Sequence, residues 1–310
     1  MNIQEAIDKC VISMEAYRAK KTARSYQNGL NAFLRYLKTE KIDPPTPLEI
    51  LKMSHFIGFP EWLATNKYSK KTMQVYISGV KFFLDWMVIG GHIEPTYAET
   101  RRYKYSNEMI NHRREDKLPR FPALDDPDKM REAVRLLKYE SPIQERNMAI
   151  IEMLISTGCR NNELCQLKIN DFADGFRSAV VMGKGSKERR IFLSKRAHEA
   201  IVHYWKIRGS QNKSDPAFAR HDRGAGKKKG LKFLTTTSIR NIVVEAAKMA
   251  GIENFTPHYF RHAFAIKMLR ETSNLALVQD LLGHKSPAAT RVYAKIYPAD
   301  LEAAHKKVYG

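Results

Sequence analysis

The sequence has few cysteines and no long apolar run. Its three cysteines, Cys10, Cys159 and Cys165, are an odd number without regular spacing, which argues against a secreted, disulfide-stabilised protein. No stretch approaches the roughly 18 apolar residues of a membrane-spanning helix, and segment 1–20 alternates charged with apolar residues instead of forming a signal-peptide core. We therefore expect a soluble protein of the reducing cytoplasm.

Acidic residues are also scarce relative to basic ones. The chain has 33 Asp and Glu against 53 Lys and Arg, a formal net charge of +20, and its pI is near 9.8. Such an excess favours a polyanionic partner, because each phosphate contact releases counterions. The 43% hydrophobic content in 310 residues allows two domains with separate cores. The composition favours a folded nucleic-acid-binding protein; the alternative is a basic protein that binds no polyanion.

Strand patterns are scarce before residue 107, where apolar residues recur at helical spacing. The pattern predicts four helices, at about 3–18, 22–39, 47–65 and 69–89. The second and fourth share a motif 50 residues apart: Lys-Lys-Thr, then matching Tyr, Gly, Phe and Leu. We interpret the apolar matches as similar core stripes of two amphipathic helices. The basic helix starts, each opened by its threonine, are expected to contact DNA phosphates through Lys20, Lys21, Thr22, Lys70, Lys71 and Thr72.

The rest of the chain predicts a linker and a second, mixed domain. Residues 108–122 are polar, basic and proline-bounded, as linkers are. They would join a helical DNA-clamp domain (1–107) to a second domain with a C-terminal tail helix (123–310). Two short strands, 178–182 and 189–193, would form a hairpin with a glycine-rich tip. We expect helices at about 127–139, 142–157, 195–208, 236–250, 257–271 and 274–283.

Three short motifs have side chains suited to chemistry on a phosphate. The first is Thr157-Gly-Cys-Arg160-Asn-Asn-Glu163, in which Gly158 ends a helix and Arg160 starts the next, with Glu163 on the same face. The second, His258-Tyr-Phe-Arg261-His262, follows a proline in a first helical turn. The third is Leu281-Leu-Gly-His284, with Tyr293 nine residues later. Each taken alone also has an ordinary structural reading, such as a capping arginine or a packed histidine.

With a lysine of the predicted hairpin, these motifs supply two arginines, a tyrosine and the histidines His258 and His284, the inventory for metal-free phosphoryl transfer. Two guanidiniums can bind the non-bridging oxygens of a phosphodiester by paired hydrogen bonds. Tyrosine, with an ordinary pKa near 10, needs a base or strong phosphate activation to attack. A zinc site from His258 and His262 is the alternative, but it lacks a third ligand and the HExxH glutamate.

These motifs, in this order, resemble the tyrosine recombinase and phage integrase family, most closely its Xer-type branch. The resemblance covers nearly the whole chain. It implies a mainly α-helical fold with a small β-sheet, made of an N-terminal core-binding (SAM-like) domain and a catalytic domain that close around DNA. It implies no cofactor and no metal, and these catalytic residues: Arg160, Lys184, His258, Arg261, His284 and Tyr293, with Glu163 in support.

The hairpin lysine of the family's GKGxKxR motif falls on Lys184, which would protonate the leaving oxygen. Lys187 is the runner-up for that role and a further DNA contact, and Tyr297 is a weaker candidate nucleophile. The resemblance implies a site-specific recombinase that cuts and rejoins DNA through a 3′-phosphotyrosyl intermediate. It would act as a homo-tetramer on two duplexes, associated with the nucleoid, with its tail docked on a neighbouring protomer. The alternatives are a type IB topoisomerase-like relaxing enzyme and a catalytically inactive DNA-binding accessory factor.

Overall fold

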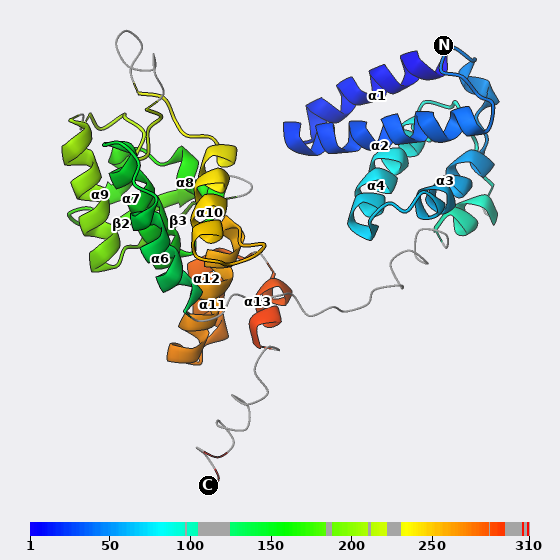
Figure 1. Ribbon diagram of the computed structural model, residues 1–310. Coiled ribbons are helices and arrows are strands. Elements are labelled where there is room, and N and C mark those ends of the chain that lie inside the picture. Colours follow the sequence, from blue (N-terminus) through cyan, green and yellow to red (C-terminus); the bar gives the residue numbers. More distant parts are fainter. Residues whose placement is uncertain are drawn as a thin grey trace. The chain divides into compact units, whose positions relative to one another are not determined.

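The computed structural model describes residues 1–96, 98–104, 125–183, 188–209, 212–221, 231–284, 286–294, 306 and 309. The chain divides into two compact units, Met1–Leu118 and Pro119–Gly310 (Figure 1). Helices dominate both, and the named strands of the described part form one three-stranded sheet in the second unit. The predicted fold class is thus confirmed. Within the described part, no helix combines the length and apolar character needed to cross a membrane.

The first unit is a bundle of four long helices, as predicted. They are α1 (Ile3–Tyr17), α2 (Lys20–Thr39), α3 (Met53–Thr65) and α4 (Lys70–Ile89). The third was expected to begin at 47, but a separate 3₁₀ turn occupies Leu48–Ile50, and Leu51 and Lys52 are extended before α3 begins. Phenylalanines fill the centre: Phe33 stacks on Phe56 with ring centroids 5.1 Å apart.

Helices α2 and α4 approach so closely that their backbones touch at two glycines. A Cβ atom on Gly29 would lie 2.7 Å from Cα of Tyr76, and one on Gly79 would lie 2.6 Å from the carbonyl oxygen of Tyr26. The contacts are reciprocal, since each helix offers its glycine to the other's tyrosine. The 50-residue repeat therefore has a structural cause in this paired crossing, beyond the similar core stripes that we expected.

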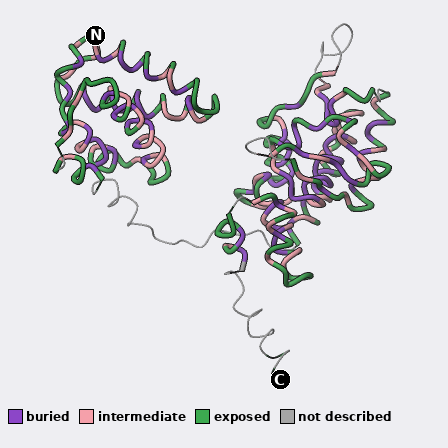
Figure 2. The backbone as a smooth tube through the Cα atoms, turned by 180° about the vertical axis from the view of Figure 1, so that it is seen from behind, coloured by how far each residue is buried: buried purple, intermediate pink, exposed green. Residues whose placement is uncertain are grey.

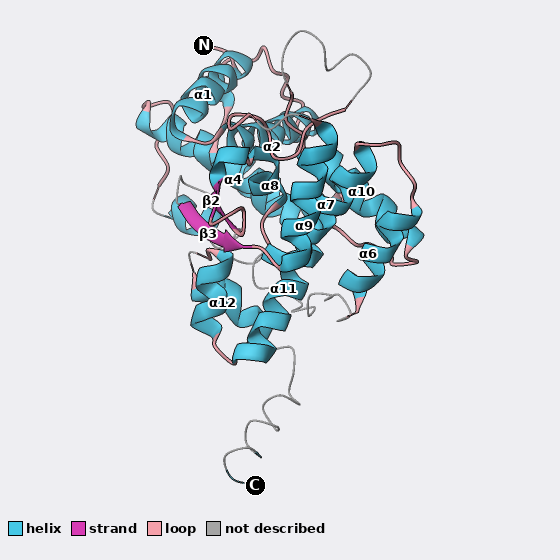
Figure 3. Cartoon of the chain, turned by 90° about the vertical axis from the view of Figure 1, so that its left-hand side faces the viewer, coloured by secondary structure: helices cyan, strands magenta, loops and turns pink. Residues whose placement is uncertain are grey.

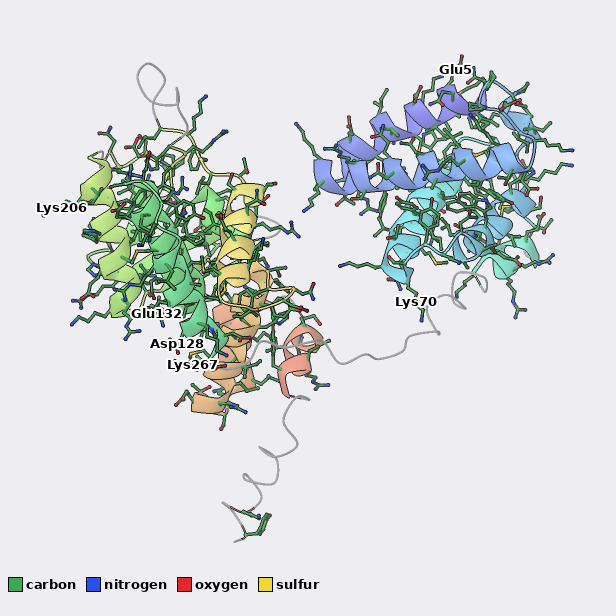
Figure 4. All side chains as sticks on the ribbon, in the orientation of Figure 1. Glu5, Lys70, Asp128, Glu132, Lys206 and Lys267 are labelled. Atoms are coloured by element: carbon green, nitrogen blue, oxygen red, sulfur yellow. The ribbon has the colours of Figure 1, made fainter. Side chains whose placement is uncertain are left out.

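The basic ends of α2 and α4 differ in one detail from the prediction. The helices begin at the lysines, so Thr22 and Thr72 stand in the first turn and do not open it. Ser69 caps α4 by accepting from Thr72 N at 3.2 Å, whereas Ala19 precedes α2 without a side-chain cap. The lysines of both helix starts are exposed, and Figure 4 shows Lys70 at the start of α4.

The second unit is built around one central helix. The helices of this unit are α6 (Asp126–Leu136), α7 (Ile143–Thr157), α8 (Asn161–Gln166), α9 (Lys195–Arg208), α10 (Thr236–Met249), α11 (Pro257–Thr272), α12 (Leu275–Leu282) and α13 (Pro287–Ala294), and α7 is the central one. Helix α7 packs against α6, α9 and α11, with Ile150, Ile151 and Leu154 fully buried. Purple segments in Figure 2 mark this interior. The sequence did not predict α13, and the first helix ends at Leu136, three residues early.

The small sheet is antiparallel, in the order β1 (Phe172–Ala173), β2 (Ser178–Met182), β3 (Glu188–Phe192). The predicted β2–β3 hairpin is confirmed, with Val181 opposite Arg189, but β3 begins at 188 and β1 was not predicted. The predicted tip residues 184–187 lie outside the described residues. Strand β3 contacts α12 (Figure 3), so Arg189 reaches the end of that helix.

Candidate active site

Glu163 is the buried carboxylate on which two arginines meet. It lies in α8 with 2% of its side chain exposed, and Arg160, the residue before that helix, donates to it from the backbone N and from Nη1, both at 2.7 Å. Arg189 of β3 donates from Nη2 at 2.8 Å, and its Nη1 forms a 2.8 Å ion pair without hydrogen-bond alignment. Burial raises the pKa of Glu163, but the hydrogen bonds from Arg189 and Arg160 outweigh it, so the pKa is below its ordinary value.

Three arginines converge on the carboxyl end of α12. Arg189 Nε donates to Leu281 O at 3.1 Å, Arg261 Nη2 donates to Leu282 O, and Arg160 Nη2 lies 3.5 Å from Gly283 O. The last carbonyls of a helix have no partner inside it and carry its negative partial charge, so they attract cations. Gly283 ends α12 at φ +63°, and a Cβ there would lie 2.8 Å from Cδ of Arg189. The backbone carbonyls of Leu281, Leu282 and Gly283 thus form a frame that orients the three arginines.

Arg261 is the most deeply buried cation of this frame, with 1% of the residue exposed. Its Nη1 donates to Gly158 O at 3.0 Å, at the carboxyl end of α7. Burial, then the nearby Arg160 and Arg189, lower the pKa of Arg261 to about 10. The guanidinium stays charged at neutral pH, and an added anion would relieve its repulsion with the other two arginines.

Three histidines stand beside this cluster. His258 is exposed in the first turn of α11, and His262 follows one turn later, with ring centroids 4.5 Å apart. His284, just after α12, shares a 2.8 Å hydrogen bond between its Nδ1 and Thr290 Oγ1. Burial and then the neighbouring cationic groups lower the pKa of His262 and of His284 to about 4. Both rings are therefore neutral at pH 7.

Tyr293 lies on α13 against this cluster, with 4% of the residue exposed. Its hydroxyl is 2.9 Å from His262 Nδ1, and its ring is nearly parallel to that of His284, with centroids 6.4 Å apart. The ring packs on Ile266, Val278 and other apolar side chains of α11 and α12. Burial raises the pKa of Tyr293, although Arg261 and Arg160 oppose the change.

Comparisons with known proteins show the family of the chain. Residues 126–299 match the phage integrase family, and residues 11–89 match the phage integrase N-terminal SAM-like domain. The chain belongs to the phage integrase family. Tyrosine recombinase XerC of Thermodesulfovibrio yellowstonii is 30% identical over 92% of this chain and 89% of its own. XerD of Listeria innocua is 28% identical over 93% and 92%. The chain is thus a Xer-like tyrosine recombinase.

Solved structures of integrase-family proteins share the fold. XerH bound to a palindromic difH substrate has a TM-score of 0.71 at 21% identity, covering 91% of this chain and 78% of its own. A lambda integrase tetramer bound to a Holliday junction has a TM-score of 0.65 at 18% identity, covering 93% and 78%. At these identities the likeness concerns the fold alone.

The structure gathers most of the integrase-type residues that the sequence predicts. Six lie in one cluster of the second unit: Arg160, Glu163, His258, Arg261, His284 and Tyr293. The predicted lysines Lys184 and Lys187 lie outside the described residues, as do Tyr297 and most of the predicted tail helix. The predicted DNA-binding lysines and threonines of α2 and α4 lie in the other unit.

Sequence reasoning missed three side chains of this integrase site: Arg189, His262 and Thr290. Arg189 is the arginine of the GKGxKxR motif, so its position was visible although its bond to Glu163 was not. His262 was considered only as a zinc ligand, and its neighbour across the cluster is the Tyr293 hydroxyl. Among the described residues, no three His, Cys, Asp or Glu side chains are grouped as metal ligands would be.

Proposed function

We propose that Tyr293 is the nucleophile of this site-specific DNA recombinase, forming a 3′-phosphotyrosyl link and freeing a 5′ hydroxyl that attacks the partner strand. The observation that supports this most is the meeting of Arg160 and Arg261 at the end of α12, within the cluster that holds the Tyr293 hydroxyl. Since the ester keeps the bond energy, the reaction needs neither ATP nor a metal.

Each remaining group has a role that fits its position. Arg160 and Arg261 would bind the non-bridging phosphate oxygens and stabilise the charge of the transition state. His258 and His284 would donate further hydrogen bonds to that phosphate. Glu163 touches both Arg160 and Arg189, so it acts as a positioning residue for the first. Lys184 would protonate the leaving 5′ oxygen, with Lys187 as the alternative acid.

The partner would be a double-stranded recombination site. We assign residues 1–107 to a clamp domain that contacts phosphates through the starts of α2 and α4, 108–122 to a basic linker and 123–310 to the catalytic domain. The tetrameric lambda integrase on a Holliday junction suggests the same assembly here, with the tail docked on a neighbouring protomer. Such a protein would act on the nucleoid, in the cytoplasm.

A covalent-trapping experiment tests the nucleophile. Protein-linked fragments of genomic DNA are captured and sequenced to locate the cleaved site, and a duplex nicked beside that site then traps the adduct. We expect the wild type to form a 3′-linked adduct, Tyr293→Phe to form none, and Tyr297→Phe to match the wild type. No wild-type adduct would remove the enzymatic role; loss of the adduct in Tyr297→Phe alone would move the nucleophile.

Strand joining separates recombination from relaxation. A recombinase transfers the cut strand to a second duplex, whereas a topoisomerase-like enzyme reseals only its own nick. We expect labelled strands to be joined between two different duplexes that carry the mapped site. Relaxation of supercoiled DNA without any such joint product would contradict recombination.

A further inference from the structure

His262 has no role in the mechanism described so far, yet it contacts the attacking atom. Its Nδ1 lies 2.9 Å from the hydroxyl oxygen of Tyr293, and the two ring centroids are 5.5 Å apart. The contact joins α11 to α13. Since α11 also provides Arg261, the helix that holds a phosphate-binding arginine also holds the partner of the phenol.

The protonation states define the direction of this hydrogen bond. Burial, then His258, Arg261 and His284, lower the pKa of His262, so its ring is neutral at pH 7. Burial raises the pKa of Tyr293, so the phenol keeps its proton. The phenol therefore donates and Nδ1 accepts, which places the ring's own proton on Nε2.

We propose that His262 is the general base for Tyr293. As the phenol oxygen bonds to phosphorus and the bond from phosphorus to the 5′ oxygen breaks, the phenolic proton passes to Nδ1. The departing oxygen takes a proton from the separate acid assigned to Lys184. On rejoining, Nδ1 returns its proton to the phenol oxygen, so one group serves both directions. This inference rests on the proposed function.

Binding of DNA would strengthen this base. In the free protein, the titratable groups next to His262 are His258, Tyr259, Arg261, His284 and Tyr293. Arg261 in turn lies near Arg160 and Arg189, with Glu163 as the acid. A bound phosphodiester adds a negative charge beside the arginines and offsets their repulsion of an imidazolium. The proton affinity of His262 rises when the substrate is in place, and again as transition-state charge develops.

The exposed histidine one turn away offers the proton a route. The ring of His258 is 4.5 Å from that of His262, centroid to centroid, and lies in the solvent-facing first turn of α11. A charge arriving on His262 is then next to a group in contact with water. The competing role for His262 is to hold Tyr293 in its buried resting position, and the two roles predict opposite effects of truncation.

The test compares His262→Ala and His262→Asn with the wild type on the trapping duplex. Asparagine keeps a polar atom near the position of Nδ1 but accepts no proton at neutral pH. His203→Ala, an exposed histidine of α9, is the matched control. A second duplex replaces the leaving 5′ oxygen by sulfur, which needs no acid but still needs a deprotonated phenol. Circular dichroism checks that each variant is folded, and His262→Asn supplies the answer if His262→Ala is not.

We expect both His262 variants to cleave about 100-fold more slowly than the wild type, within the usual range for general bases. The sulfur substrate should not restore the cleavage rate of the His262 variants, whereas it should restore the cleavage rate of Lys184→Ala. The defect should shrink between about pH 7 and about pH 9.5, as solvent takes over deprotonation of the phenol. His203→Ala should match the wild type.

Three results would overturn the inference: cleavage by His262→Ala at or above the wild-type rate, full activity in His262→Asn, or rescue by the sulfur substrate. Cleavage by His262→Ala at or above the wild-type rate would mean that His262 holds Tyr293 in its resting position. Full activity in His262→Asn would mean that His262 only positions the phenol. Rescue by the sulfur substrate would mean that His262 acts on the leaving 5′ oxygen. Failure of the proposed function is separate, because then the wild type itself forms no adduct.

Discussion

The two units use basic side chains at opposite ends of helices. In the first unit, Lys20 and Lys70 begin α2 and α4, where the helix dipole repels a cation, and both side chains are exposed. In the second unit, Arg261 and Arg189 donate to the carbonyls that end α12, where the dipole attracts a cation, and both are largely buried. The first arrangement costs stability unless an anion binds, whereas the second is stable by itself.

The two arrangements suit different tasks: the first adds affinity for DNA, and the second sets the geometry of the active site. Exposed lysines contact phosphate as flexible point charges and add affinity that salt weakens. Arginines fixed by carbonyls and by Glu163 have lost their rotational freedom before DNA arrives, which is what stabilising a transition state requires. Variants of the second unit should therefore change stability and the cleavage rate, and variants of the first should change binding.

Glu163→Gln should have the largest effect on stability. It removes the negative charge between Arg160 and Arg189 and leaves the buried Arg189 without a counter-charge. Breaking a buried ion pair in this way typically costs about 3 to 5 kcal/mol of unfolding free energy. Because the pKa of Glu163 is lowered in the folded state, its stabilisation is present above its ordinary pKa and is lost as pH falls through the folded-state value. Urea unfolding of the wild type and of Glu163→Gln as a function of pH measures this. The difference between their free energies of unfolding should become smaller in acid.

The control is Glu132→Gln, an exposed glutamate of α6 labelled in Figure 4, whose ion pair with Arg135 is 3.6 Å long. Surface pairs of this kind contribute about 0 to 1 kcal/mol. Equal stability changes in the two variants would contradict the special place of Glu163. A Glu163→Gln protein that cleaves DNA at the wild-type rate would remove its positioning role.

Much of this site was predictable because its residues lie in short local motifs. The sequence predicted that Gly158 and Gly283 end helices, which they do at positive φ, and that Glu163 lies on the same face as Arg160. The sequence did not reveal bonds between distant segments, such as Arg189 to Leu281, because which carbonyl meets which arginine depends on how β3 packs on α12. The start of α3 was missed because the turn at Leu48–Ile50 and the two extended residues after it follow the same apolar pattern as the helix.

Gly283→Ala should have an intermediate effect. The alanine would pay for a left-handed backbone, about 1 kcal/mol, and its Cβ would displace Arg189, which lies 2.8 Å away. We expect a loss of about 2 kcal/mol in unfolding free energy, adding the strain and a modest packing cost, together with slower cleavage on the trapping duplex.

Gly209→Ala isolates the backbone strain. Gly209 ends α9 at φ +78°, and a Cβ there has no atom within 4 Å, so only the strain applies. This variant should lose about 1 kcal/mol and cleave normally. If both alanines slowed cleavage equally, the contact between Gly283 and Arg189 would not matter for the geometry of the site.

Lys70→Ala should have the smallest effect. It tests the contrast between the two units because stability and DNA binding should change in opposite directions. Removing a cation from the start of α4 should raise the free energy of unfolding by about 0.3 to 1 kcal/mol. DNA binding should weaken, and the slope of log K against the logarithm of the salt concentration should become shallower by about one.

Lys206→Ala is the matched change at the other end of a helix, since Lys206 is exposed in the last turn of α9 (Figure 4). There the dipole favours the cation, so stability should fall slightly. Fluorescence anisotropy at several salt concentrations and thermal unfolding measure both variants. A Lys70→Ala protein that loses stability and keeps its salt dependence would mean that the start of α4 serves folding, and the contrast between the two units would then fail.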